Sequence, residues 1–204
     1  GFPDFDGPEA LLQAVNSHMR NGQNQYPPRA GVAALRQAIA AKVLDLYGLA
    51  CDFDTELTVT AGATEALFCA ITAVVHAGDE VIVLDPAYDS YDPVIRLQGG
   101  VPVHIPLQAP QYRIDWDRIE AAITTNTRLL ILNSPHNPTG MVMDEDDIAA
   151  LSALCAKNDI YLIGDEVYEH MVFDHAQHLS LCAYEDLYLS LIHISEPTSP
   201  TPIA

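Results

Sequence analysis

The most informative stretch of the sequence is Asn133-Ser134-Pro135-His136-Asn137-Pro138-Thr139-Gly140. It follows the apolar run 129–132, which is typical of a buried parallel strand. A second apolar run, 160–163, is followed in the same way by Gly164-Asp165-Glu166-Val167-Tyr168. Because ligands of open α/β sheets bind beyond the carboxyl ends of the strands, we expect the polar side chains of both stretches to converge on one crevice.

Three of these side chains form an unusual chemical set: the amide of Asn137, the carboxylate of Asp165 and the phenol of Tyr168. The set suits a heteroaromatic ring with a basic nitrogen at one edge and a phenolic oxygen at the other, because a carboxylate beside a ring nitrogen favours its protonated form. Each stretch alone has a plainer explanation, since Asn-Pro-Thr-Gly is a good turn sequence. The order of the two stretches and their placement at strand ends favour a binding site for such a ring over this plainer explanation.

A third stretch predicts a phosphate site. The run 57–60 is typical of a strand, and the small-residue turn Gly62-Ala63-Thr64 opens an apolar helix that runs to about Val75. A helix N-terminus offers backbone N–H groups and the positive end of the helix dipole. The turn has neither the Gly-Lys-Ser/Thr of a Walker loop nor the Gly-x-Gly-x-x-Gly of a dinucleotide site. The alternative is an ordinary strand-to-helix turn with Thr64 as a cap.

Strands and helices alternate along the chain, which predicts an α/β fold with a mostly parallel sheet between two layers of helices. A first helix is expected to begin at Pro8, with apolar residues at positions 11, 12, 15 and 19 on one side. The other expected helices cover 31–47, 88–97, 115–123 and 144–157, and further strands cover 80–84 and 101–105.

Composition narrows the class of protein. The net charge is 9 − 28 = −19, which argues against nucleic acid or an anionic membrane as a partner. Four cysteines without Cys-x-x-Cys spacing predict buried, reduced thiols and a cytoplasmic location. The three histidines at 170, 175 and 178 lie in a loop sequence without matching carboxylate spacing, so we expect surface histidines and not a metal site.

Together these motifs resemble the class I/II aminotransferases, which are fold-type I enzymes that use pyridoxal 5′-phosphate (PLP). The resemblance implies that Asn137 and Tyr168 contact the phenolic oxygen of the cofactor and that Asp165 pairs with its ring nitrogen. It also implies that Gly62, Ala63 and Thr64 bind the phosphate and that Tyr88 stacks on the ring. Two further roles follow: Tyr26 reaches the phosphate of a partner subunit, and Gly1 and Asn137 bind the substrate.

The resemblance is closest to the methionine and kynurenine aminotransferase branch. It implies a cytoplasmic homodimer whose substrates are an amino acid (methionine, aromatic or similarly apolar) and a 2-oxo acid. Two alternatives remain open at this point: a PLP-dependent lyase or decarboxylase with the same ring site, and a non-catalytic aminotransferase-like regulatory domain.

The sequence departs from the family in two features: a lysine and the C-terminal tail. The family's Schiff-base lysine has no counterpart, because Lys42 lies in an early helix and Lys157 ends the helix before the Asp165 strand. We expect an N-terminal segment of the small domain at 1–30, an incomplete PLP-binding large domain at 31–187 and a non-native tail at 188–204. Three prolines at 197–202 predict that the tail forms no strand, which would leave the Asp165 strand at an open edge. Because the Schiff-base lysine is missing, we expect the chain to be inactive.

Overall fold

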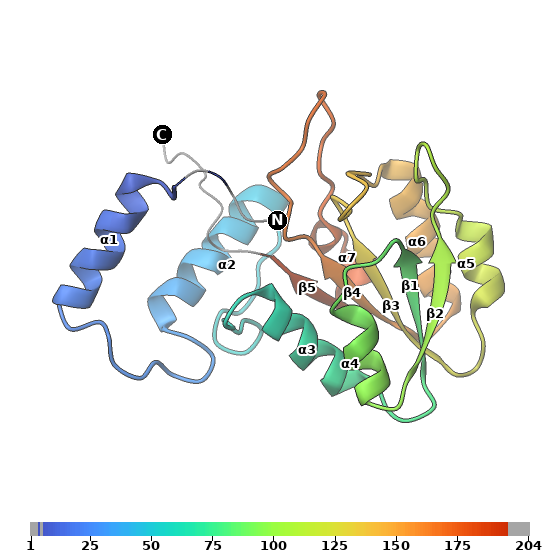
Figure 1. Ribbon diagram of the computed structural model, residues 1–204, viewed down its shortest axis with the longest axis horizontal. Coiled ribbons are helices and arrows are strands. Elements are labelled where there is room, and N and C mark those ends of the chain that lie inside the picture. The colour runs from blue at the N-terminus through green and yellow to red at the C-terminus, as the bar shows by residue number, and fades with distance from the viewer. Residues whose placement is uncertain (1–3, 5, 196–204) are drawn as a thin grey trace.

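The computed structural model describes residue 4 and residues 6–195 of the chain (Figure 1). The helices are α1 (Glu9–Arg20), α2 (Ala33–Tyr47), α3 (Ala63–Val74), α4 (Tyr91–Leu97), α5 (Trp116–Ala122), α6 (Glu145–Lys157), the 3₁₀ turn η1 (Leu181–Ala183) and α7 (Glu185–Tyr188). The strands are β1 (Glu80–Asp85), β2 (Val101–Pro106), β3 (Thr127–Asn133), β4 (Tyr161–Asp165) and β5 (Leu191–Ile194).

The strands form one parallel sheet in the order β2-β1-β3-β4-β5. The register matters most between β3 and β4, where Asn133 pairs with Asp165. Both are the last residues of their strands, so the loops that follow start side by side at the carboxyl edge of the sheet.

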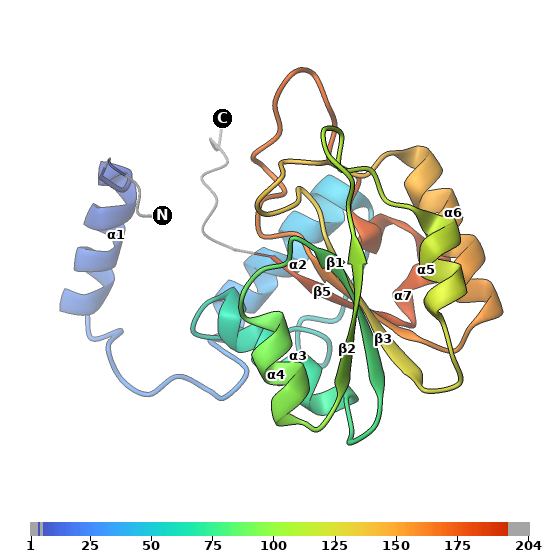
Figure 2. The ribbon, with the colours of Figure 1, turned by 45° about the vertical axis from the view of Figure 1, so that its right-hand side comes forward.

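Successive residues of the central strands face opposite layers of helices, as strand geometry requires. Leu130, Leu132 and Leu162 pack in a cluster with α5, α6 and α7, whereas Leu129, Ile131 and Ile163 pack with α3 and α4. Figures 1 and 2 show these helices on the two faces of the twisted sheet. The predicted α/β fold with a mostly parallel sheet is therefore confirmed.

Helix α6 shows how the local sequence fixes an element that the sheet then buries. The Asp144 side chain accepts from the Asp147 N–H, and the Asp147 side chain accepts from the Asp144 N–H, which forms a capping box. The acidic first turn also faces the positive end of the helix dipole. Arg113 then donates to both carboxylates, at 2.6 Å and 2.8 Å.

Two expectations about strands are wrong. The run 57–60 is no strand: the Val59 N–H donates to the Ala30 carbonyl at 3.0 Å, so the segment lies along the loop before α2 and stays outside the sheet. The expected open edge beside β4 is also absent, because β5 pairs with it in parallel. The apolar Leu191-Ile192-His193-Ile194 run ends before the first of the three prolines, so proline does not prevent its pairing.

Helix α1 stands apart from the sheet in both ribbon views (Figures 1 and 2). Its expected apolar side is present, but none of its residues is buried. Within the described part of the chain, no helix is both long enough and apolar enough to span a bilayer.

Candidate cofactor site

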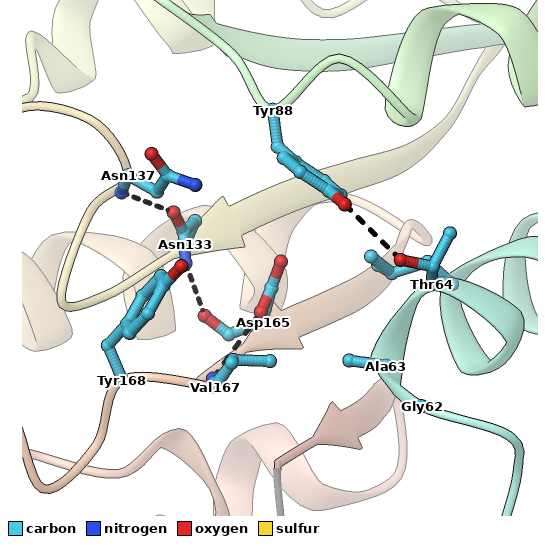
Figure 3. A pocket seen from close by; sticks show the side chains of 10 residues that line it. Gly62, Ala63, Thr64, Tyr88, Asn133, Asn137, Asp165, Val167 and Tyr168 are labelled. Atoms are coloured by element: carbon cyan, nitrogen blue, oxygen red, sulfur yellow. Dashed lines mark hydrogen bonds between the residues drawn. The ribbon is translucent and has the colours of Figure 1, made fainter. Parts of the chain in front are cut away.

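A pocket of about 240 Å³ opens at the carboxyl edge of the sheet (Figure 3). Predicted site residues from the ends of three strands and from the start of α3 line it: Gly62, Ala63, Thr64, Tyr88, Asn137, Asp165 and Tyr168. Leu67, Asn133 and Val167 complete the lining. The structure therefore brings together residues that are up to about a hundred positions apart in the sequence.

Asn133 connects the two motifs, and sequence reasoning had not assigned it a role. Its side-chain amide donates to the Asp165 carbonyl at 2.8 Å, and its side-chain oxygen accepts from the Asn137 N–H at 2.6 Å. These bonds are drawn in Figure 3. Asn133 is buried, so both bonds are shielded from water. Its position as a polar residue at the very end of an apolar strand was the signal that could have identified it.

The loop that carries Asn137 is closed by its own backbone. The His136 N–H donates to the Met141 carbonyl, and the Gly140 N–H donates to the His136 carbonyl. Gly140 has a φ of 74°, a conformation that glycine adopts without strain. Burial lowers the pKa of His136, whose Nδ1 lies 2.8 Å from the Thr139 hydroxyl. This tight turn holds Asn137 over the end of β3.

Asp165 is only 5% exposed, and its carboxylate lies in the middle of the pocket (Figure 3). The Tyr91 hydroxyl donates to Oδ2 at 2.5 Å, and the Val167 N–H donates to Oδ1 at 3.4 Å. Tyr91 was also missed, although it lies three residues after Tyr88. Burial, together with the nearby charge of Asp165, raises the pKa of Tyr91 far above its usual value, so this phenol remains a hydrogen-bond donor.

The opposite side of the pocket is the N-terminus of α3. Gly62 precedes the helix with a φ of 86°, which favours glycine. The Glu65 side chain accepts from the Ala61 N–H and so fixes the turn ahead of the helix. The Thr64 hydroxyl lies 3.2 Å from the Tyr88 hydroxyl, which connects the helix start to the loop after β1. Backbone N–H groups and the positive dipole end thus border the pocket.

Other residues that the sequence singled out lie elsewhere. Tyr26 is fully exposed and does not line the pocket, and Gly1 lies outside the described residues. The Lys42 ammonium lies 2.5 Å from a Glu169 carboxylate oxygen, and Lys157 pairs with Glu120 at 2.9 Å. In the part of the chain that the structure describes, neither lysine borders the pocket.

A second polar cluster lies behind the Asp165 turn and corrects the expectation of surface histidines. His178 has a side chain only 5% exposed, and its Nε2 lies 2.8 Å from the buried Glu166 carboxylate. The Nε2 of His193 lies 3.1 Å from the same oxygen. Of the three loop histidines, His170 and His175 are exposed, as expected. Across residues 4 and 6–195, no group of three or more His, Cys, Asp or Glu side chains could hold a metal ion.

The pocket fits a planar ring with a basic nitrogen and an attached phosphate. Its buried carboxylate can pair with a protonated nitrogen, and its amide and phenol can bond to a ring oxygen. The face of Tyr88 offers an aromatic surface, and the start of α3 offers an anion site. PLP combines these groups in one molecule.

Comparison with known proteins agrees with this chemistry. A family model described as aminotransferase class I and II matches residues 1–195. The chain therefore belongs to the class I and II aminotransferase family, whose relatives are PLP-dependent. The match extends past residue 187, the expected end of the large domain, and includes the first residues of the expected tail. The non-native origin of the tail stays a prediction.

Individual relatives are similar over nearly the whole chain. Methionine aminotransferase of Escherichia coli is 50% identical over 195 residues, which are 96% of this chain and 50% of that protein. A probable N-succinyldiaminopimelate aminotransferase of Mycobacterium tuberculosis is 45% identical over 197 residues. The chain spans about half the length of these curated relatives.

Solved structures give the same result. The crystal structure of YbdL from Escherichia coli, identified as a methionine aminotransferase, has a TM-score of 0.93 and covers 96% of this chain and 51% of that one. The aromatic aminotransferase from Pyrococcus horikoshii has a TM-score of 0.92 at 35% identity, again over 96% of this chain and 52% of that one.

Proposed function

We propose that this chain carries most of the cofactor-binding surface of a PLP-dependent aminotransferase. In the whole enzyme an amino acid gives its amino group to the cofactor, and a 2-oxo acid then accepts it. The single observation that carries the proposal is the convergence of Asn137, Asp165 and Tyr168 on one pocket that also includes the start of α3. Bound PLP supplies an electron sink, which protonation of its ring nitrogen strengthens.

Each pocket residue has a proposed task. Asp165 holds the proton on the ring nitrogen through its charge, and Asn137 and Tyr168 bond to the phenolic oxygen. Gly62, Ala63 and Thr64 bind the phosphate at the helix N-terminus, and Tyr88 covers one face of the ring.

The substrates and assembly belong to the same proposal. The relatives with the names methionine aminotransferase and aromatic-amino-acid aminotransferase support an apolar or aromatic amino donor. Gly1 and Asn137 are proposed to contact the substrate. Full exposure of Tyr26 is consistent with its proposed role at the phosphate of a second subunit in a cytoplasmic homodimer.

The chain itself is proposed to be inactive. Lys42 and Lys157 are its only lysines, and both are paired with carboxylates away from the pocket. Neither lysine lies where it could form the Schiff base with the cofactor or move the proton of the substrate carbon, the two tasks of the family's lysine.

The test is PLP binding measured by absorbance, followed by borohydride reduction and mass spectrometry. We expect weak, saturable binding without stoichiometric labelling of Lys42 or Lys157. Asp165→Asn is nearly isosteric but uncharged, so it should weaken binding by about tenfold, the usual contribution of a hydrogen bond to a charged group. Stoichiometric labelling of one lysine would contradict the inactive state, and an unchanged affinity of Asp165→Asn would contradict the ring-nitrogen role.

The alternatives share the ring site. A PLP-dependent lyase or decarboxylase would use Asp165 and Asn137 in the same way, and only the second half of the protein would distinguish it. A regulatory domain that binds DNA through an attached module is disfavoured by the net charge of −19.

A further inference from the structure

Tyr91 is buried behind the pocket: it contacts the pocket residue Asp165 but does not line the pocket itself. It is 3% exposed at the first position of α4. Its hydroxyl donates to Oδ2 of Asp165 at 2.5 Å. Its ring meets that of Tyr88 edge to face, with centroids 5.8 Å apart and planes inclined by 76°. One side chain therefore supports both the carboxylate and the aromatic wall of the pocket.

The physical effect of this contact concerns charge. A buried carboxylate loses hydration, which favours its neutral form, and a hydrogen bond donated to the charged form opposes that effect. Besides Asp165, the titratable groups that act on Tyr91 include Tyr88 and Tyr168, whose phenols are neutral near pH 7. The short hydrogen bond from the Tyr91 hydroxyl therefore favours a negative Asp165, and the longer one from the Val167 N–H adds to it.

We propose that Tyr91 is a positioning residue that keeps Asp165 ionised and aimed into the pocket, and thereby sets the protonation state of the nitrogen in a bound ring. The inference rests on the proposed function, because it requires a ring with a basic nitrogen beside Asp165. One proton is shared between the carboxylate and the ring nitrogen. Donation from Tyr91 stabilises the carboxylate, so the proton resides on the nitrogen; without the hydroxyl, the same proton moves to Asp165.

The test uses the full chain with PLP that carries ¹⁵N at the ring position, observed by NMR at saturation. In Tyr91→Phe the ratio of unprotonated to protonated ring nitrogen should rise about tenfold, which corresponds to a hydrogen bond to a charged group. The signal should therefore move toward that of Asp165→Asn. Tyr161→Phe is the matched control, because it removes the same group from β4 outside the pocket and should leave the signal unchanged.

Folding is checked for each variant by circular dichroism and thermal melting. Tyr91→Met removes the donor with a different apolar side chain and should displace the signal in the same direction. If the parent chain binds PLP but Tyr91→Phe and Tyr91→Met leave the nitrogen signal in place, the Tyr91 inference is overturned and the proposed function stands. If the parent chain does not bind PLP, the proposed function and the inference are overturned together.

Discussion

The carboxyl edge of the sheet and helix α1 carry equally clear sequence signals but end in different environments. At the sheet edge, Asp165 and Asn133 are buried, and the Asn133 side-chain amide donates to the Asp165 carbonyl. Along α1, the apolar side residues are about half exposed: Leu11, Leu12, Val15 and Met19. An apolar pattern makes one side of a helix or strand suitable for packing, but that side is buried only where the fold places another element against it.

The difference has an energetic meaning. Side chains of β3 contact helices on both faces of the sheet, so removing one of them leaves a cavity. Side chains of α1 already contact solvent, and shortening one of them changes little. The two regions should therefore respond differently to the same substitution.

The largest expected effect is in the sheet. Leu130→Ala removes a fully buried side chain from β3 and should lower the free energy of unfolding by about 2–5 kcal/mol. Leu12→Ala, the matched change in α1, should stay within about 0.5 kcal/mol of the parent, as most surface substitutions do. Urea unfolding of the two variants measures the contrast. Equal losses would show that α1 is packed as part of the same core.

The next effect tests the buried ions behind the pocket. Burial raises the pKa of Glu166, but the hydrogen bond from His178 and the ion-pair contact with His193 outweigh it and lower the pKa to about 2. Because the folded pKa lies below the unfolded one, Glu166 stabilises the fold above about pH 4.5, and this contribution is lost as the pH falls toward 2. The loss should be about 3 kcal/mol at most.

Glu166→Gln should remove most of this dependence. Melting temperatures measured from pH 6 to pH 2.5 should fall less steeply in the variant than in the parent, whatever its stability at neutral pH. Burial lowers the pKa of His193, but the close contact with the Glu166 carboxylate raises it above its usual value overall. The contribution of His193 is therefore complete below pH 6.5 and is lost as the pH rises through the folded pKa. If the melting temperatures of the parent and of Glu166→Gln fell equally steeply in acid, the stabilising role of the Glu166 carboxylate would be contradicted.

The smallest effect on stability, and the clearest on association, should come from α1. The exposed apolar side of this helix should promote self-association, although the net charge of −19 opposes it. Leu12→Glu with Val15→Glu should shift the chain toward monomer in size-exclusion chromatography and leave the melting temperature unchanged. A chain that is already a monodisperse monomer with a sharp melt would contradict the expectation of association.

The sequence determined most of the pocket because its information is local. Polar residues directly after apolar strands had to appear at the carboxyl edge once the strands were parallel, and this placed Asn137, Asp165 and Tyr168 together. The small-residue turn before α3 was equally readable, since a helix start needs no distant partner. The alternation of strands and helices fixed the covered parallel sheet for the same reason.

Only the tertiary structure decided which distant residues support these groups. Tyr91 reaches Asp165 across 74 positions, and Asn133 reaches it across 32. His178 changed from an expected surface residue to a partner of Glu166. The run 57–60 stayed outside the sheet although its sequence predicts a strand, and 191–194 entered the sheet although the tail was expected to form no strand. Strand pairing and buried hydrogen bonds depend on neighbours that the folded chain supplies, so local sequence defines the candidates and tertiary packing selects among them.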